Sequence, residues 1–207
     1  MPLIHSQQLN NNTKIGVWHI TETEDFFFEK YSLQRNITHS HKRLQHLAGR
    51  HLLSILFPHF PTEAIKIADT KKPFLENEAF HFSISHCGNY AAAVVSTQNR
   101  VGVDIEIPHP KIERIQHKFL SENENIIFKN LLTNIFSTIT MAWSIKEAIF
   151  KWYGLGAVDF KKHIQIQKIT KVGESIVANC VFCKEDIILL QVHNITLFGN
   201  NLSWVIT

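Results

Sequence analysis

The fold class is decided by residues 80–107, FHFSISHCGNYAAAVVSTQNRVGVDIEI. The first part of this stretch alternates between apolar and polar residues with the period of two that is typical of a β-strand, and HCGN at 86–89 supplies turn residues. Two further segments, residues 90–96 and 101–107, have the length and the composition of strands. The stretch therefore predicts three consecutive strands in an antiparallel meander.

Helical patterns lie on both sides of these strands. Residues 40–57 carry an apolar stripe at helical spacing and end before Pro58, and residues 139–153 carry another that ends before Gly154. Ser121 and Glu124 have the spacing of a capping box, which predicts a helix start at Ser121. A β-hairpin is predicted through residues 199–201. Because helices and antiparallel strands are mixed without a βαβ rhythm, the predicted fold class is α+β.

Length and composition are those of a soluble globular protein. The chain has 207 residues, of which 44% are hydrophobic and 19% charged, and a formal net charge of +3. These values exclude disorder, collagen and coiled coil. Three cysteines, without a secretory leader or an apolar run long enough to span a membrane, favour the cytoplasm. The mildly basic charge does not indicate nucleic acid, and it suits an acidic protein partner or a phosphorylated ligand.

Two carboxylates share one face of the strand predicted at residues 101–107. Side chains two positions apart on a strand point the same way, so Asp104 and Glu106 project together while Val103 and Ile105 point to the other face. A divalent cation would relieve the repulsion, and oxygen ligands without Cys or a partnered His favour Mg²⁺, Mn²⁺ or Ca²⁺ over zinc. An exposed edge strand with two solvated acids is the alternative. Gly102 indicates a bulge or a close approach of a ligand.

A second charged group lies on the helix predicted at residues 139–153. Glu147 and Lys151 are one turn apart, on the side opposite the apolar stripe. Trp143 and Phe150 flank the pair, which favours a cleft wall, although a simple salt bridge between the two residues is the alternative. Together with the two strand carboxylates, these groups suit a metal and a phosphorylated substrate. Glu147 is then the candidate base or third metal ligand, and Lys151 the candidate stabiliser of charge on the leaving phosphate.

These motifs resemble those of the Sfp-type 4'-phosphopantetheinyl transferases. The similarity rests on VGVDIE at 101–106, WSIKEAIFK at 143–151 and GLG at 154–156, preceded in order by LAGR at 47–50, KP at 72–73 and FSISH at 82–86. Several motifs in the right order with the right gaps leave little room for chance. The resemblance implies one compact unit made of two similar α+β halves related by pseudo-twofold symmetry, residues 1–100 and 101–207. Coenzyme A and Mg²⁺ would bind in the cleft between the halves, with coenzyme A contacts from the first and the catalytic residues from the second.

The resemblance also implies a reaction and a set of site residues. The 4'-phosphopantetheine arm of coenzyme A would move to a serine of an acyl or peptidyl carrier protein, with release of adenosine 3',5'-bisphosphate, in fatty acid, polyketide or nonribosomal peptide synthesis. The implied ligands of Mg²⁺, or of Mn²⁺, are Asp104, Glu106 and Glu147. The implied catalytic residues are Glu147, Lys151 and Lys146. The implied coenzyme A contacts are Arg43, Arg50, Lys72, Pro73, Ser85, His86 and Asp104. Lys30 and Arg35 are further candidates for phosphate contacts, and the alternative for each is an exposed residue that aids solubility.

Two other functions fit the same residues. One is a carrier-protein-binding module without catalysis, although such a module has no physical reason to keep like charges together in a cleft. The other is a metal-dependent enzyme that acts on a different phosphorylated small molecule, and coenzyme A binding would separate these two. Neither a nucleic acid nor a membrane is expected as a partner. A monomer is predicted, because the length supplies both halves.

Overall fold

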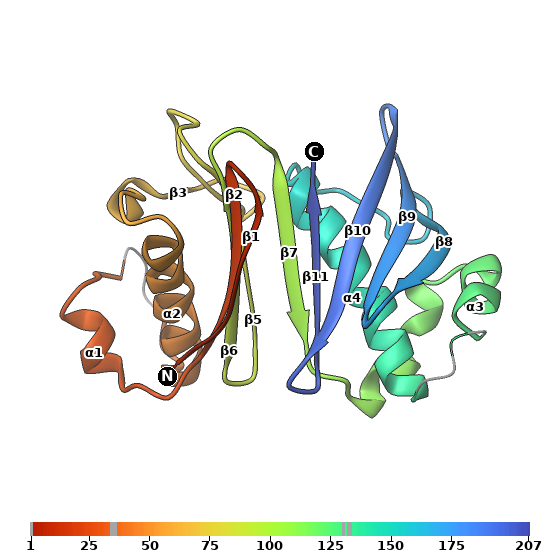
Figure 1. The fold of residues 1–207 in the computed structure, drawn as a ribbon, viewed down its shortest axis with the longest axis horizontal. Helices are drawn as coiled ribbons and strands as arrows, with labels where there is room; N and C mark the ends of the chain where they lie inside the picture. The colour runs from red at the N-terminus through yellow and green to blue at the C-terminus, as the bar shows by residue number, and fades with distance from the viewer. Residues whose placement is uncertain (1, 34–36, 130, 132–133) are drawn as a thin grey trace. The chain divides into compact units, whose positions relative to one another are not determined.

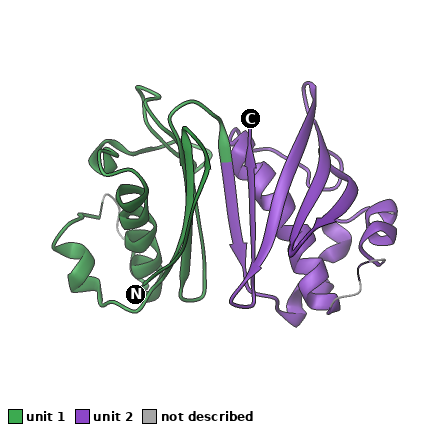
Figure 2. Cartoon of the chain, viewed as in Figure 1, with its two compact units in different colours: residues 1–101 green, residues 102–207 purple. Residues whose placement is uncertain are grey.

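The computed structural model describes residues 2–33, 37–129, 131 and 134–207. Arg35, one of the candidates for a phosphate contact, lies outside these residues. The chain divides into two compact units, Met1–Val101 and Gly102–Thr207, which Figure 2 shows in green and purple. Among the described residues, no helix combines the length and the apolarity that crossing a membrane would take.

Unit 1 is a β-sheet covered on one face by a long helix. Its strands lie in the order β1 (Leu3–Asn10), β2 (Thr13–His19), β6 (Tyr90–Ser96) and β5 (His81–Cys87), and neighbouring strands are antiparallel. Helix α2 (Ser40–Leu56) packs against the sheet, and α1 (Glu24–Phe28) lies on the outer side of α2 (Figure 1). The 3-10 helix η1 (Thr62–Ala64) precedes a small antiparallel hairpin of β3 (Lys66–Ile67) and β4 (Pro73–Phe74).

The core of unit 1 lies between α2 and the sheet. Leu47 and Leu52 of the helix are fully buried, as are Ala93 and Val95 of β6. Small residues allow the helix to come close to the sheet: a Cβ at Gly49 would lie 2.6 Å from the Ile84 Cγ2 atom. The apolar stripe predicted for residues 40–57 therefore faces the sheet.

Unit 2 is a second sheet with its own covering helix. Its strands lie in the order β7 (Val101–Glu106), β11 (Asn200–Ile206), β10 (Ile187–Leu197), β9 (Ser175–Cys183) and β8 (Ile164–Val172). Helix α4 (Ile135–Tyr153) packs along the face of this sheet against β11 and β10. The short 3-10 helices η2 (Pro110–Arg114) and η3 (Gln116–Lys118) link β7 to α3 (Glu122–Lys129), which lies beside β8 (Figure 1).

The structure confirms the predicted fold class and most of the local predictions. Helices and antiparallel strands are mixed as expected for an α+β fold, while the pseudo-twofold relation between the halves stays a prediction. The capping box is formed: the Glu124 N–H donates to Ser121 Oγ at 3.2 Å, and the Ser121 N–H donates to Glu124 Oε2 at 2.8 Å. The C-terminal hairpin turns at Phe198 and Gly199, which both have positive φ, one residue before the predicted position.

Two local predictions needed correction. Helix α4 begins at Ile135 rather than at residue 139, because the side chain of Asn134 accepts hydrogen bonds from the first N–H groups of the helix. The three-strand meander is right for β5 and β6 but wrong for β7, which joins the sheet of unit 2 beside β11. Alternation shows that residues 101–107 form a strand, but it does not show which strand pairs with it.

Candidate active site

The centre of the candidate site is an ion pair between β7 and α4. The Asp104 side chain is buried, and Lys151 donates from Nζ to its Oδ1 atom at 2.7 Å. Ser144 on the same helix donates to the Asp104 carbonyl oxygen at 3.4 Å. The acid of one sequence motif and the lysine of the other are therefore in direct contact.

β7 comes this close to α4 because residue 102 has no side chain. A Cβ atom at Gly102 would clash with the carbonyl oxygen of Ala148 and would lie 2.7 Å from the backbone nitrogen of Trp152. Both are backbone atoms of the helix, so neither can rotate away. The sequence predicted a bulge or a close ligand approach at Gly102, and what approaches in the structure is the helix.

Glu147 is a partly buried carboxyl one helical turn before Lys151. Burial raises its pKa to about 7, and the negative charges of Asp104 and Glu106 act in the same direction, whereas Lys151 opposes them. The three carboxylates are therefore near enough to repel one another. A carboxyl with a pKa near 7 exchanges its proton readily at neutral pH, which suits a general base.

An aromatic pocket of about 830 Å³ opens beside Glu147. Its walls include Phe119, Trp143, Phe150 and Phe160. The Trp143 ring lies between two of them, with centroid distances of 5.0 Å to Phe119 and 5.3 Å to Phe160. Trp143 and Phe150 thus line a cavity next to Glu147, as expected for a cleft wall.

Lys146 points away from this pocket into the interior of unit 2. Its side chain is completely buried, and its Nζ atom forms an ion pair of 2.7 Å with Glu124 Oε1. The same ammonium donates to the backbone carbonyl oxygens of Phe119, Phe160 and Ile164 at 2.7–2.9 Å. These four oxygens surround the ammonium, so this position does not suit the catalytic role that the resemblance implies for Lys146.

The residues that surround Lys146 were not predicted from the sequence. Glu124 was expected only as part of a helix cap, and the structure shows that it also neutralises the buried lysine. Nothing in the local pattern pointed to Phe119 or Phe160. Both contact α4 from outside the helix, Phe119 from the segment before α3 and Phe160 from the loop after α4. The capping box was the one local signal that included any of the residues around Lys146.

The three carboxylates do not form a metal cluster in their present arrangement. Within residues 2–33, 37–129, 131 and 134–207, no group of three or more His, Cys, Asp or Glu side chains is arranged to hold a metal ion. Asp104 is instead paired with Lys151. The chemistry of the donors nevertheless fits a hard divalent cation, because Asp104, Glu106 and Glu147 offer only oxygen. Such a cation would also reduce the repulsion that raises the pKa of Glu147.

The predicted coenzyme A contacts other than Asp104 belong to unit 1. Lys72 is partly buried before β4, and burial together with the charge of Arg100 lowers its pKa to about 8. Two cations that repel each other favour an anionic ligand. Pro73 begins β4, and on β5 the Ser85 side chain is buried whereas His86 is exposed.

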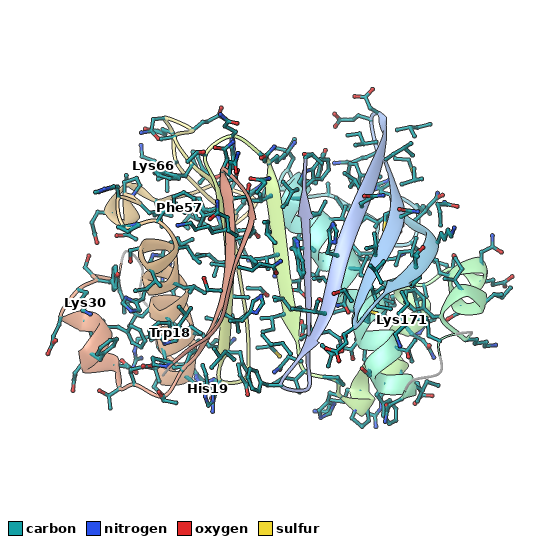
Figure 3. The ribbon with its side chains drawn as sticks, viewed as in Figure 1. Trp18, His19, Lys30, Phe57, Lys66 and Lys171 are labelled. Carbon is teal, nitrogen blue, oxygen red and sulfur yellow. The ribbon has the colours of Figure 1, made fainter. Side chains whose placement is uncertain are left out.

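The predicted basic contacts on α2, Arg43 and Arg50, are engaged within unit 1. Arg43 forms an ion pair with Glu24, with 2.8 Å between Nε and Oε2, and donates to two backbone carbonyl oxygens before α2. Arg50 is buried, and its Nη1 atom lies 3.1 Å from His46 Nδ1. Lys30, two residues after the end of α1, is exposed and lies away from the sheet (Figure 3). Arg43 therefore ties α1 to α2, and a phosphate contact would have to displace Glu24.

Comparison with known proteins gives the same result as the motifs. Residues 100–194 match the family described as the 4'-phosphopantetheinyl transferase superfamily. The chain is 26% identical over 125 residues to a putative 4'-phosphopantetheinyl transferase of Haemophilus influenzae, an alignment covering 58% of this chain and 53% of that protein. It is 31% and 32% identical over 113 residues to enterobactin synthase component D of Salmonella typhi and of Salmonella austin, covering 53% of this chain and 47% of each relative. The chain thus spans about half the length of the curated relatives it matches.

The matched segment includes β7 and α4, which carry the three carboxylates and Lys151. Fold and site together describe an α+β protein with an acidic centre between a strand and a helix. The resemblance to the 4'-phosphopantetheinyl transferases that the motifs indicated is confirmed, and residues 100–194 carry the pattern of this superfamily.

Proposed function

We propose that this protein transfers the 4'-phosphopantetheine arm of coenzyme A to a serine of an acyl or peptidyl carrier protein. The observation that carries the proposal is the environment of the Glu147 carboxyl. Its carboxyl has a pKa raised to about 7, lies near two further carboxylates and lines an aromatic pocket. The superfamily match and the names of the relatives support the same reaction.

We assign the aromatic pocket to the pantetheine arm. The arm is long, uncharged and amide-linked, so aromatic walls with a few polar groups suit it better than they suit a phosphate. Phe119, Trp143 and Phe160 would contact its hydrocarbon and amide parts. With the arm in this pocket, the phosphate that carries it would lie near Glu147 and Lys151.

In the proposed step, the serine hydroxyl oxygen attacks the phosphorus atom that carries the pantetheine arm. A new P–O bond forms while the bond to the bridging oxygen of the diphosphate breaks. Adenosine 3',5'-bisphosphate leaves with the electron pair. The Glu147 carboxylate takes the hydroxyl proton, and the Lys151 ammonium offsets the negative charge on the leaving phosphate.

We propose that Asp104, Glu106 and Glu147 hold a Mg²⁺ ion, with Mn²⁺ as a substitute. When bound, the ion would neutralise charge on the phosphate oxygens. Because Lys151 pairs with Asp104 in the structure, we expect the ion and the lysine to compete for this carboxylate. The proposed unit 1 contacts remain Lys72 and Pro73 near the adenine, and Ser85, His86 and Arg50 near the phosphates.

Intact mass spectrometry of carrier proteins tests the proposal. A panel of apo carriers is incubated with this protein, coenzyme A and Mg²⁺, and a carrier that is a substrate gains about 340 Da, the mass of the arm. Glu147→Gln should lose at least a hundredfold in rate. Glu174→Gln, which removes an exposed carboxyl from the turn between β8 and β9, should transfer like the wild type.

The other outcomes separate the alternatives. If no carrier gains mass although coenzyme A binds, the non-catalytic carrier-binding module is favoured. If coenzyme A does not bind either, an enzyme for another phosphorylated molecule is favoured. A gain at the wild-type rate in Glu147→Gln would reject Glu147 as the base.

A further inference from the structure

We propose that Lys146 and Glu124 form a positioning pair that fixes the aromatic wall of the pocket beside Glu147. Neither side chain faces the pocket, and both act through the backbone of other residues. The proposal rests on the proposed function, because it takes this pocket as part of the site of transfer. One buried ammonium holds the carbonyl groups of two aromatic residues in the pocket wall.

The Lys146 ammonium contacts the backbone of two residues that form the pocket wall. The Nζ atom lies 2.7 Å from the carbonyl oxygen of Phe119 and 2.9 Å from that of Phe160. The rings of these same two residues pack against Trp143 and line the pocket. Because Lys146 directly precedes Glu147 on α4, one helical turn carries both the candidate base and the group that anchors the wall around it.

Glu124 connects the ammonium to two further elements. Its Oε1 atom accepts from the Lys146 ammonium at 2.7 Å and from the backbone N–H of Ile166 on β8 at 2.8 Å. Its Oε2 atom accepts at 2.8 Å from the backbone N–H of Ser121, the residue directly before α3. The pair therefore joins α3, α4, β8 and the segments around Phe119 and Phe160 at one point.

The carbonyl contacts of Lys146, and not the ion pair with Glu124 alone, account for a buried ammonium at this place. Burying two charges costs desolvation energy, and well-packed apolar side chains in place of a buried ion pair are often as stabilising. An apolar residue at 146 would, however, leave the carbonyl oxygens of Phe119, Phe160 and Ile164 without the donor that Lys146 supplies. A single ammonium facing several oxygens fixes their distances to one another, which an apolar side chain cannot do.

The test compares Lys146→Met with Val205→Ala, a control that weakens the same core on β11. Amide hydrogen exchange by mass spectrometry follows the backbone around Phe119 and Phe160, where the Leu120 and His163 N–H groups are hydrogen-bonded. Transfer to a carrier protein is measured in parallel. Each variant is assayed equally far below its own midpoint of thermal unfolding, so that lost stability does not mimic lost positioning.

We expect Lys146→Met to increase exchange in residues 117–120 and 158–165 and to lower kcat/KM for coenzyme A at least tenfold. Val205→Ala should leave exchange in both segments unchanged and lower kcat/KM less than threefold. Unchanged exchange in Lys146→Met would overturn the proposal, and so would a loss of transfer no larger than that of Val205→Ala.

A second variant covers the case in which Lys146→Met does not fold. Glu124→Gln keeps an acceptor for the Ser121 or Ile166 N–H but removes the charge, and it should raise exchange in the same two segments. Unchanged exchange in Glu124→Gln would then reject the proposal. If the wild type transfers nothing to any carrier, the proposed function fails, whereas the exchange measurement still decides whether the pair holds the wall.

Discussion

Replacing Gly102 by alanine tests whether the close contact between β7 and α4 holds the candidate site together. The added methyl group would clash with the carbonyl oxygen of Ala148 and lie 2.7 Å from the Trp152 nitrogen. An ordinary contact needs about 3.4 Å or more, so strand and helix would have to separate by about 1 Å. Overpacking a core costs about 1–3 kcal/mol even when side chains can shift. Because backbone atoms block this methyl group, we expect Gly102→Ala to lower the free energy of unfolding by about 3 kcal/mol.

The assay is thermal and urea unfolding followed by circular dichroism. At about 2–4 °C per kcal/mol for a chain of this size, Gly102→Ala should lower the midpoint temperature by about 6–12 °C. Separation should also stretch the Asp104–Lys151 ion pair, so transfer should fall at least tenfold. The matched control is Gly173→Ala, whose Cβ meets nothing within 4 Å and whose positive φ should cost only about 1 kcal/mol. A loss of stability for Gly102→Ala no greater than for this control would refute the reasoning.

Three further predictions concern titration and capping. Glu147→Gln should stabilise the protein by about 1–3 kcal/mol at pH 8 and by little at pH 4.5. The Glu147 carboxyl has a pKa of about 7 in the folded protein and about 4.5 in the unfolded chain, so the wild type loses stability as the pH rises through this window. Equal midpoints of thermal unfolding for Glu147→Gln and the wild type at pH 8 would contradict this prediction. Burial lowers the pKa of His51, so the folded protein binds fewer protons than the unfolded chain and loses stability as the pH falls below 6.5. In urea titrations between pH 7 and pH 5, His51→Gln should reduce the loss in free energy of unfolding. An unchanged loss would indicate that other histidines cause it. Ser121→Ala should lower the free energy of unfolding by about 1 kcal/mol, because the Glu124 N–H loses its acceptor. An unchanged midpoint of urea unfolding would show that the cap is dispensable.

The local features of the fold could be predicted from the sequence because each depends on neighbouring residues. The α2 stripe, the alternation of β5 and the Ser121–Glu124 capping box are repeated or paired within a few positions. The same holds for Glu147 and Lys151, which the helical period places one turn apart. The family resemblance of the two motifs, 101–106 and 143–151, implied that Asp104 and Glu147 share a metal ion, but it did not predict the ion pair between Asp104 and Lys151.

Other features depend on contacts between residues far apart in the chain, and only the tertiary structure decided them. β7 pairs with β11 and is not part of the predicted meander. The alternation of residues in a sequence indicates a strand, but it does not indicate which strand lies beside it. Lys146 lies next to Glu147 in the sequence, yet its ammonium is buried among oxygens from three other segments while Glu147 lines a pocket. The sequence by itself determined which residues share a face of a helix or strand, and folding determined what each face meets.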